Sequence, residues 1–260
     1  MRWPAPQCVL ITGASGGIGG GLAREYAAPG RILILQGRDA SRLADVTRQC
    51  QEAGAEVRAH RVDLARPEDR DAWFSRLADA PIPDLLILNA GITSSIGTHG
   101  EGEDPATVAE LLEINLKAAV LLTEAVIPAM RRRRRGQIAL ISSVSAYFGL
   151  PLTPSYCASK AGMKAYGEAL RGWLAPQGIA VSVVMPGFVS SAMSDQFPAR
   201  KPFIVSPERA ATLIRRGLEG NRARIAFPWM LRVGMWWLAL LPPDLSLKLL
   251  RWLGYDGHGN

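Results

Sequence analysis

The stretch Cys8-Val-Leu-Ile-Thr-Gly-Ala-Ser-Gly-Gly-Ile-Gly19 decides the fold of this chain. Its first four residues form an apolar run that predicts a buried strand, and the residues after Gly19 are helix-like. A strand, a glycine-rich turn and a helix in this order aim backbone N–H groups and a helix N-terminus at a phosphate. The glycines at positions 13, 17 and 19 differ from the usual dinucleotide spacing of Gly-x-Gly-x-x-Gly. We nevertheless expect a nucleotide-binding turn here rather than a tight turn without a ligand.

Strand-like and helix-like segments alternate along the rest of the chain. The segments that predict further strands are Arg31–Gln36, Glu56–Val62, Leu85–Leu88, Gln137–Ile141 and Ile179–Met185, with Arg224–Phe227 as a candidate seventh. Nearly continuous apolar strands between helices predict a parallel sheet covered on both faces. The expected fold class is therefore α/β, a Rossmann-type doubly wound sheet of about seven strands. The 260 residues, 48% of them hydrophobic, suit a single domain with a full core.

A second informative stretch runs from Ser142 to Lys160. Tyr156 and Lys160 are four residues apart, so on a helix that begins near Pro154 they lie on one face. Ser143, at the carboxyl end of the preceding strand, can reach the same place from the other side. A hydroxyl, a phenol and an ammonium together suit proton transfer to or from an oxygen. Because a cation favours the phenolate, we expect Lys160 to lower the pKa of Tyr156 from its ordinary value of about 10.

The residues at the end of the second predicted strand indicate whether the cofactor is NADP or NAD. An NAD site places an acid at the tip of this strand, where it binds the ribose 2′-hydroxyl. Here the tip is Gly37 and the next residue is Arg38, whose guanidinium suits the 2′-phosphate of NADP. Asp39 keeps NAD open as an alternative, although it also suits the cap of the next helix. We therefore expect NADP or NADPH as the preferred cofactor.

Other polar and glycine-rich clusters also follow predicted strands. They are Asp63-Leu64, Asn89-Ala90-Gly91 and Pro186-Gly187. In open parallel sheets, ligands bind at the carboxyl ends of the strands. The clusters and the Ser143–Tyr156–Lys160 set are therefore expected at one site.

A long helix is expected from about Asp104 to Met130, with Asn115 midway. Five consecutive arginines, Arg131–Arg135, complement the dipole at its C-terminus, and Gly136 is expected to terminate it. No aromatic stripe or binding motif accompanies the arginines, so we expect no nucleic-acid partner. The formal net charge of +7 then points to anionic cofactors and surfaces.

The cysteines and histidines limit the kinds of disulfide and metal site that this chain can form. The three cysteines are scattered without metal-binding spacing, which indicates a reducing compartment and no disulfide framework. The three histidines are far apart in sequence, so no metal site is expected. The first seven residues hold no run long enough for a secretory signal. These features favour a cytoplasmic protein.

In combination, the motifs between about Cys8 and Gly217 resemble those of the short-chain dehydrogenases/reductases in their single-domain form. The resemblance implies the strand order 3-2-1-4-5-6-7 and a homodimer or homotetramer. It also implies a mobile lid over Phe188 to Ser206. Gly16 stands where NADP-using relatives often carry Arg or Lys, so Arg38 alone supports NADP.

The resemblance also implies roles for individual residues. Tyr156 would be the acid/base, and Lys160 would lower its pKa and hold the nicotinamide ribose. Ser143 would bind and polarise the substrate oxygen, and Asn115 would hold a water in the proton relay. The residues expected to contact the cofactor are Gly13, Ser15, Gly17, Ile18, Gly19, Arg38, Asp63, Leu64, Asn89, Ala90, Gly91, Tyr156, Lys160, Pro186, Gly187, Val189 and Ser191.

Residues 225–260 form an apolar, tryptophan-rich extension, which we expect to be helical. Its apolar stretch is interrupted by Arg232 and stopped by Pro242-Pro243, so it is too short to span a bilayer. Two helices that pack over the substrate cleft or at a dimer interface are expected. The alternative is contact of residues 228–253 with a membrane surface, which tryptophans beside basic residues suit. Both arrangements favour a bulky or lipophilic substrate.

The sequence therefore predicts an NADP-dependent oxidoreductase that interconverts a carbonyl and a secondary alcohol by hydride transfer, with Tyr156 as acid/base. Two alternatives stay open: a non-catalytic NADP-binding regulator or scaffold on the same fold, and a sugar-nucleotide-modifying enzyme. The presence of Asn115, Ser143, Tyr156 and Lys160 argues against the regulator, which has no need of them. The length and the glycine spacing disfavour the sugar-nucleotide enzyme.

Overall fold

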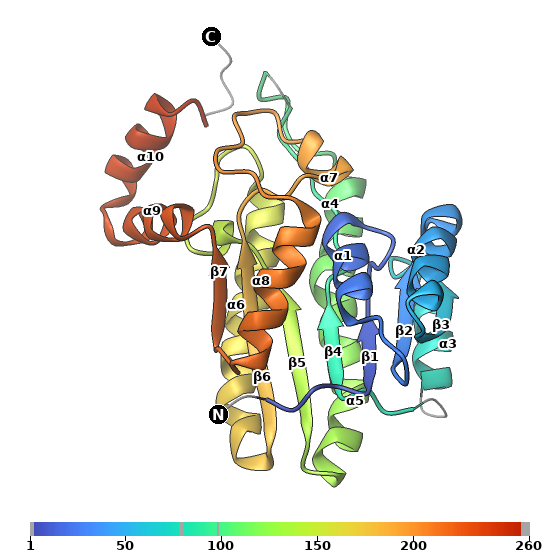
Figure 1. Ribbon diagram of the computed structural model, residues 1–260. Helices are drawn as coiled ribbons and strands as arrows, with labels where there is room; N and C mark the ends of the chain where they lie inside the picture. The colour runs from blue at the N-terminus through green and yellow to red at the C-terminus, as the bar shows by residue number, and fades with distance from the viewer. Residues whose placement is uncertain (1–2, 78–80, 98, 256–260) are drawn as a thin grey trace.

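A seven-stranded parallel sheet lies at the centre of the computed structural model, which describes residues 3–77, 81–97 and 99–255 (Figure 1). The strand order is β3-β2-β1-β4-β5-β6-β7, as expected. The strands are β1 (Cys8–Ile11), β2 (Ile32–Gly37), β3 (Glu56–Arg61), β4 (Leu85–Leu88), β5 (Gly136–Ile141), β6 (Ile179–Pro186) and β7 (Arg224–Phe227). The predicted α/β class and doubly wound topology are thus confirmed.

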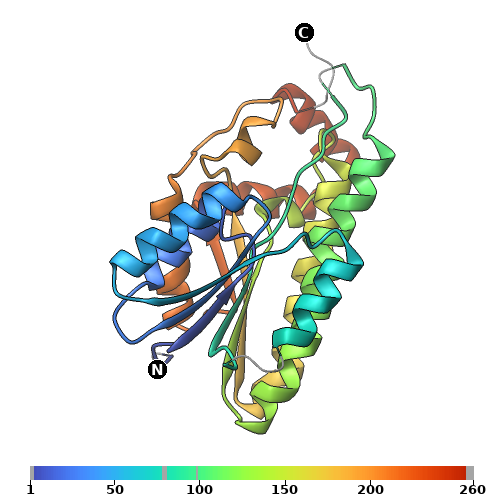
Figure 2. The same ribbon diagram turned by 90° about the vertical axis from the view of Figure 1, so that its right-hand side faces the viewer.

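Helices cover both faces of the sheet (Figure 2). One face carries α1 (Gly17–Tyr26), α2 (Ala40–Glu52) and α8 (Pro207–Glu219). The opposite face carries α3 (Pro67–Leu77), α5 (Ala118–Arg132) and α6 (Pro154–Leu174). Burial from both sides explains why β1, β4, β5 and β6 are buried along their whole length and are apolar except for Gln137 and Ser182. The edge strand β3 is mostly exposed, which accounts for its arginines and histidine.

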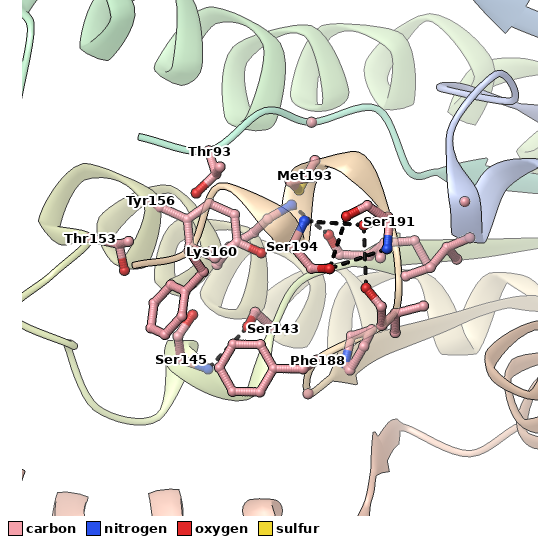
Figure 3. A pocket seen from close by; sticks show the side chains of 18 of the residues that line it. Thr93, Ser143, Ser145, Thr153, Tyr156, Lys160, Phe188, Ser191, Met193 and Ser194 are labelled. Atoms are coloured by element: carbon pink, nitrogen blue, oxygen red, sulfur yellow. Dashed lines mark hydrogen bonds between the residues drawn. The ribbon is translucent and has the colours of Figure 1, made fainter. Parts of the chain in front are cut away.

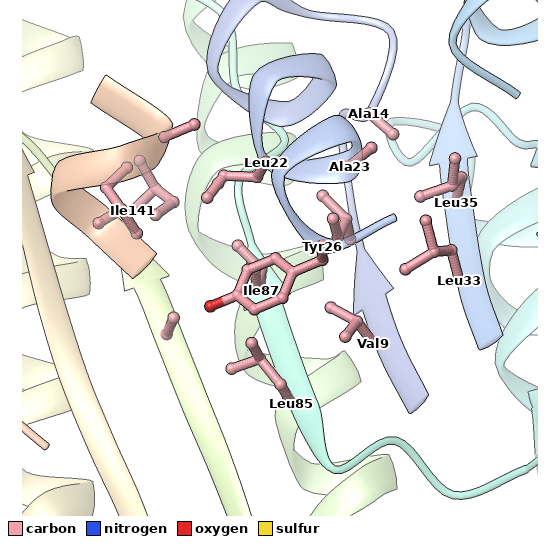
Figure 4. Packing of buried hydrophobic residues seen from close by; sticks show 14 of the residues in the cluster. Val9, Ala14, Leu22, Ala23, Tyr26, Leu33, Leu35, Leu85, Ile87 and Ile141 are labelled. Atoms are coloured by element: carbon pink, nitrogen blue, oxygen red, sulfur yellow. The ribbon is translucent and has the colours of Figure 1, made fainter. Parts of the chain in front are cut away.

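The core beneath α1 shows how the first stretch of the sequence builds the fold. Leu22, Ala23 and Tyr26 of α1 pack against strand residues such as Val9 and Leu33 (Figure 4). All five side chains are almost completely buried. This packing seats the N-terminus of α1 at the carboxyl end of β1, where the glycine-rich turn lies.

The helix expected from Asp104 to Met130 is present but contains a wider turn. It consists of α4 (Pro105–Leu112), a π turn (Glu113–Lys117) and α5. Asp104 caps α4 by accepting a hydrogen bond of 2.8 Å from the N–H of Thr107. Asn115 lies inside the π turn, an irregularity that often marks functional sites.

The expectation that Gly136 terminates this helix is wrong. The helix ends at Arg132, and the left-handed residue after it is Arg134, with a φ of 49°. Gly136 is already the first residue of β5. It has to be small because the side chain of Met130 occupies the space in which its Cβ would lie.

Two helices follow β7, α9 (Trp229–Leu240) and α10 (Pro243–Trp252), beside the carboxyl end of the sheet (Figure 1). Met235, Leu238 and Leu250 from these helices join Val183 and Met185 of β6 in a small apolar cluster. No helix among the described residues has the length and hydropathy needed to cross a bilayer. The last five residues of the predicted extension, 256–260, lie outside the described residues.

Candidate active site

A cavity of about 1380 Å³ lies at the carboxyl ends of the strands. Of all the residues expected to form the site, only Gly19 and Asn115 do not line it. Sequence segments as distant as the glycine turn, the end of β5, the start of α6 and the loop after β6 meet there. Figure 3 shows some of its lining residues, among them Tyr156 and Lys160.

The glycine turn is shaped to hold a phosphate group. Gly13 has a φ of +65°, and a Cβ there would lie 2.8 Å from the Cα of Ala90. A Cβ on Gly19 would lie 2.6 Å from Nδ2 of Asn89 and would overlap the carbonyl of Gly13. Gly16, the N-cap of α1, gives no side-chain cap, so the first N–H groups of the helix stay available to an anion. These residues fit the pyrophosphate of a dinucleotide, and Gly19 acts by allowing close packing.

Two buried polar residues outside the predicted site set, Thr12 and Gln36, hold this turn in place. Thr12 Oγ1 accepts hydrogen bonds of 3.0 Å from the N–H groups of both Asn89 and Ala90. Asn89 Nδ2 in turn donates to the carbonyls of Thr12 and Gly13 at 3.0 and 3.1 Å. Gln36 Oε1 accepts from the N–H of Gly13 at 3.0 Å. Their signal in the sequence was a polar residue at the end of an otherwise apolar strand.

Two arginines line the cavity here, the expected Arg38 directly after β2 and Arg42 in the first turn of α2. Arg38 Nη1 lies 2.7 Å from Oε1 of Glu110 on α4 in an exposed ion pair. Asp39 caps α2 by accepting a hydrogen bond of 3.0 Å from the N–H of Arg42. The carboxylate of Asp39, which had left NAD as an alternative cofactor, therefore caps a helix. This is the other role that the sequence predicted for Asp39.

Ser143, Tyr156 and Lys160 meet in the cavity as their spacing predicts. The helix α6 begins at Pro154, and Tyr156 and Lys160 lie one turn apart on its inner face. Lys160 Nζ lies 5.6 Å from the centroid of the Tyr156 ring and donates a hydrogen bond of 3.0 Å to the carbonyl of Ile141. Ser143 follows β5 and is within hydrogen-bonding reach of the phenol.

Burial shifts the pKa of both titratable groups of this set. It raises the pKa of Tyr156 to about 12, while the hydrogen bond with Ser143 acts in the opposite direction. It lowers the pKa of Lys160 to about 8, because a buried ammonium loses its hydration. The expected lowering of the Tyr156 pKa by Lys160 is therefore not seen in this structure, where burial of the phenol raises the pKa instead.

Asn115 holds the loop after β4 against α6. Its Nδ2 donates to the carbonyl of Ile92 at 2.9 Å and to Oγ of Ser159 at 3.1 Å, and its Oδ1 accepts from the N–H of Ile92 at 2.8 Å. Both amide hydrogens are thus in use, and a proton-relay role for Asn115 stays a prediction. A Cβ on Gly91 would lie 3.1 Å from Oδ1 of Asn115, so this glycine leaves room for the asparagine side chain.

The part of the cavity around Tyr156 carries further hydroxyl groups, on Thr93, Ser145 and Thr153 (Figure 3). Thr93 donates a long hydrogen bond of 3.4 Å to a main-chain carbonyl. Thr153 lies 3.6 Å from the sulfur of Cys157. Ser145 is 5% exposed, and its Oγ has no hydrogen-bond partner among the described residues. Sequence reasoning missed Ser145, although it stands two residues after Ser143.

The far wall of the cavity is apolar. Its side chains come from the loops after β5 and β6 and from α9, α10 and the residue that follows α10: Leu150, Phe188, Phe197, Met230, Leu231, Met235, Leu238, Leu249, Leu250 and Leu253. The two C-terminal helices thus pack over the cleft, which is one of the arrangements expected from the sequence.

The loop after β6 is anchored at both ends. Val189 and Val205 form an isolated parallel bridge, and the segment between them contains the short helix α7 (Ala192–Asp195). Ser191 caps α7 by accepting a hydrogen bond of 3.2 Å from the N–H of Ser194. Ser191 Oγ also donates to the carbonyl of Val189 at 3.2 Å, so its contact with a cofactor stays a prediction.

Comparison with known proteins agrees with this geometry. The family model described as short chain dehydrogenase matches residues 7–202. An uncharacterized oxidoreductase of Myxococcus xanthus is 32% identical over 245 residues, 92% of this chain and 94% of the relative. A short-chain dehydrogenase from Sphingobium yanoikuyae in complex with NADPH superposes with a TM-score of 0.80 at 29% identity, over 94% of this chain and 95% of that one. A bulky-bulky ketone specific alcohol dehydrogenase from Comamonas testosteroni gives 0.78 at 25% identity, over 94% and 93%. The chain is therefore an oxidoreductase that belongs to the short-chain dehydrogenase/reductase family.

Proposed function

We propose that this enzyme uses NADP to interconvert a carbonyl and a secondary alcohol on a bulky or lipophilic substrate. The observation that carries the proposal is the meeting of Ser143, Tyr156 and Lys160 with the glycine turn in one cavity. When bound, the nicotinamide ring would accept or supply the hydride. The Sphingobium yanoikuyae relative, which holds NADPH, supports this choice of cofactor.

Each polar group of the set has a distinct task in this reaction. The Ser143 hydroxyl binds the substrate oxygen and keeps it beside the phenol. Tyr156 gives a proton to that oxygen during reduction and removes one during oxidation. Lys160 Nζ lies 5.6 Å from the centroid of the Tyr156 ring, where it would bind the nicotinamide ribose.

The charges at the end of β2 support NADP over NAD. Arg38 and Arg42 place two guanidinium groups on the cavity wall, where they would bind the 2′-phosphate. Arg38 would then exchange its exposed ion pair with Glu110 for the phosphate.

The lining of the cavity supports the substrate class. Its apolar wall suits a large hydrocarbon part, and the unpartnered Oγ of Ser145 offers a hydrogen bond to a second oxygen of the substrate. The name of the Comamonas testosteroni relative, which is specific for bulky-bulky ketones, agrees with this choice.

The remaining predictions about this protein are part of the same proposal. They are a single domain, a homodimer or homotetramer and a cytoplasmic location. A regulator on the same fold is the second class to be tested against the enzyme.

The decisive experiment follows NADPH and NADP absorbance with lipophilic ketones, acyl-thioester ketones, keto-sugars and the matching alcohols. The Tyr156→Phe variant is measured in parallel, with NADPH binding determined separately. We expect turnover of a lipophilic ketone, and a loss of about 100-fold or more in kcat for the variant at unchanged NADPH affinity. Equal rates for the two proteins would overturn the role of Tyr156. Bound NADPH without turnover of any compound would favour the regulator.

A further inference from the structure

The helix α9 is apolar on two opposite faces. Leu231, Met235 and Leu238 line the cavity, and the last two are buried. On the opposite face, Trp229 is 66% and Trp237 54% exposed. A helix that is apolar all round normally lies buried on all sides. The composition of α9 is therefore that of a buried helix, but within the described chain its outer face is exposed.

The helix α10 extends this exposed surface. Only Ser246 and Leu250 of its residues are buried. Leu245, Leu249 and Trp252, spaced i, i+4 and i+7, share another face, and Trp252 is 80% exposed. Most of the exposed large hydrophobic side chains among the described residues lie between 229 and 253. Contiguous apolar surface of this kind marks an interaction site.

The outer surface is continuous with the inside of the cavity. Met230, Leu249 and Leu253 line the cavity, yet they are 39%, 38% and 46% exposed. They form the rim between the apolar wall and the outer faces of α9 and α10. These three side chains therefore give the outer surface and the cavity wall a shared apolar stretch.

We propose that the outer faces of α9 and α10 dock on an anionic phospholipid surface, from which lipophilic substrate enters the cavity across this rim. The substrate part rests on the proposed function. Arg232, Lys248 and Arg251 give the two helices positive charge against the single acid Asp244. Tryptophan beside basic residues is the composition of helices that lie in a bilayer interface. Docking is peripheral, because none of the described helices can span the bilayer.

A second copy of the chain is the other occupant to be considered. It would cover the rim at Met230, Leu249 and Leu253 and close the apolar end of the cavity. It would also bring the basic groups of two copies together, where like charges repel. The apolar rim of the cavity and the positive charge of the two helices therefore both favour a phospholipid surface over a second copy of the chain.

The test is co-sedimentation of the full chain with vesicles made of equal amounts of phosphatidylglycerol and phosphatidylcholine. The double variant Trp237→Ser with Trp252→Ser removes two exposed tryptophans of the docking face. Trp173→Ser is the matched control, because Trp173 is 48% exposed on α6, away from α9 and α10. We expect partitioning of the double variant to fall by about 10-fold or more while the control binds like wild type. Pure phosphatidylcholine should bind the wild type more weakly.

Measurements of turnover distinguish a loss of membrane docking from a loss of catalysis. With a short water-soluble ketone and no vesicles, the double variant should match the wild type. With a lipophilic ketone dissolved in the vesicles, its rate should fall in proportion to the lost binding. Absence of wild-type binding to anionic vesicles would overturn the proposal. So would light scattering that shows a wild-type dimer turned into a monomer by the double variant, because the face would then bind a second copy. Vesicle binding is measured without turnover, so its failure is distinct from a failure of the oxidoreductase assay.

Discussion

Lys160 Nζ lies 5.6 Å from the centre of the Tyr156 ring, and its hydrogen bond of 3.0 Å runs to the carbonyl of Ile141 at the end of β5. The ammonium is therefore held between the central sheet and the phenol. Burial at this place lowers the pKa of Lys160 to about 8, so its charge is sensitive to pH near the physiological range.

Lys160→Met should remove a pH dependence of stability. The pKa of Lys160 is about 8 in the folded protein and 10.5 as its ordinary value. Between these values the unfolded chain binds more protons, so the wild-type free energy of unfolding rises with pH. Relative to the variant, the wild type should gain about 2 kcal/mol between about pH 8 and pH 10. Urea unfolding of both proteins at each pH measures this, and parallel curves would contradict the shift.

Gly19→Ala should destabilise the protein and weaken cofactor binding. A Cβ at this position meets Asn89 Nδ2 at 2.6 Å and the carbonyl of Gly13, so α1 has to move away from the turn. We expect a loss of about 1–3 kcal/mol in thermal or urea unfolding. Gly172→Ala is the matched control, because nothing lies within 4 Å of its added Cβ in α6. That variant should gain about 0.5–1 kcal/mol. Equal effects of the two changes would show that α1 tolerates the methyl group.

The strands, the glycine turn and the meeting of Ser143, Tyr156 and Lys160 were predictable because local patterns specify them, whereas the strand order was implied by the family resemblance. Apolar runs set the strands, and a spacing of four places Tyr156 and Lys160 on one helical face. The π turn at Asn115 was not predictable from local patterns, and the Asn115 side chain in it bonds to Ile92 and Ser159, which are distant in sequence. The ion pair between Arg38 and Glu110 likewise joins residues that only the folded chain brings together.

Position 136 and the tyrosine pKa show where local rules mislead. Gly136 has the residue type of a helix terminator, but a tertiary contact with Met130 explains it. For Tyr156, the nearby cation suggested a lowered pKa, but burial of the phenol raises its pKa instead. Both errors come from tertiary packing that the spacing of residues does not show.

Arg38→Ser should change cofactor preference. The loss of a charge-assisted hydrogen bond to the 2′-phosphate should lower kcat/KM for NADPH by about 10- to 100-fold. The value for NADH should stay near that of the wild type. Glu110→Gln should act in the opposite direction and lower KM for NADPH by about 2- to 5-fold, because it frees Arg38 from an exposed ion pair. Steady-state kinetics with both cofactors decides this, and equal losses for NADPH and NADH in Arg38→Ser would refute it.

Ser145→Ala should affect catalysis without harming stability. Its buried Oγ has no hydrogen-bond partner among the described residues, so removal should leave the free energy of unfolding unchanged or slightly higher. Ser182 is the matched control, because its Oγ is equally buried and unpartnered but lies in β6 away from the cavity. For a ketone with a second oxygen near the reacting carbon, Ser145→Ala should lower kcat/KM by about 3- to 10-fold. Ser182→Ala should leave it unchanged. For a ketone without that oxygen, both variants should match the wild type, because the Ser145 hydroxyl then has nothing to bind. Equal losses of Ser145→Ala on the two ketones would show that Ser145 shapes the cavity rather than recognising an oxygen of the substrate.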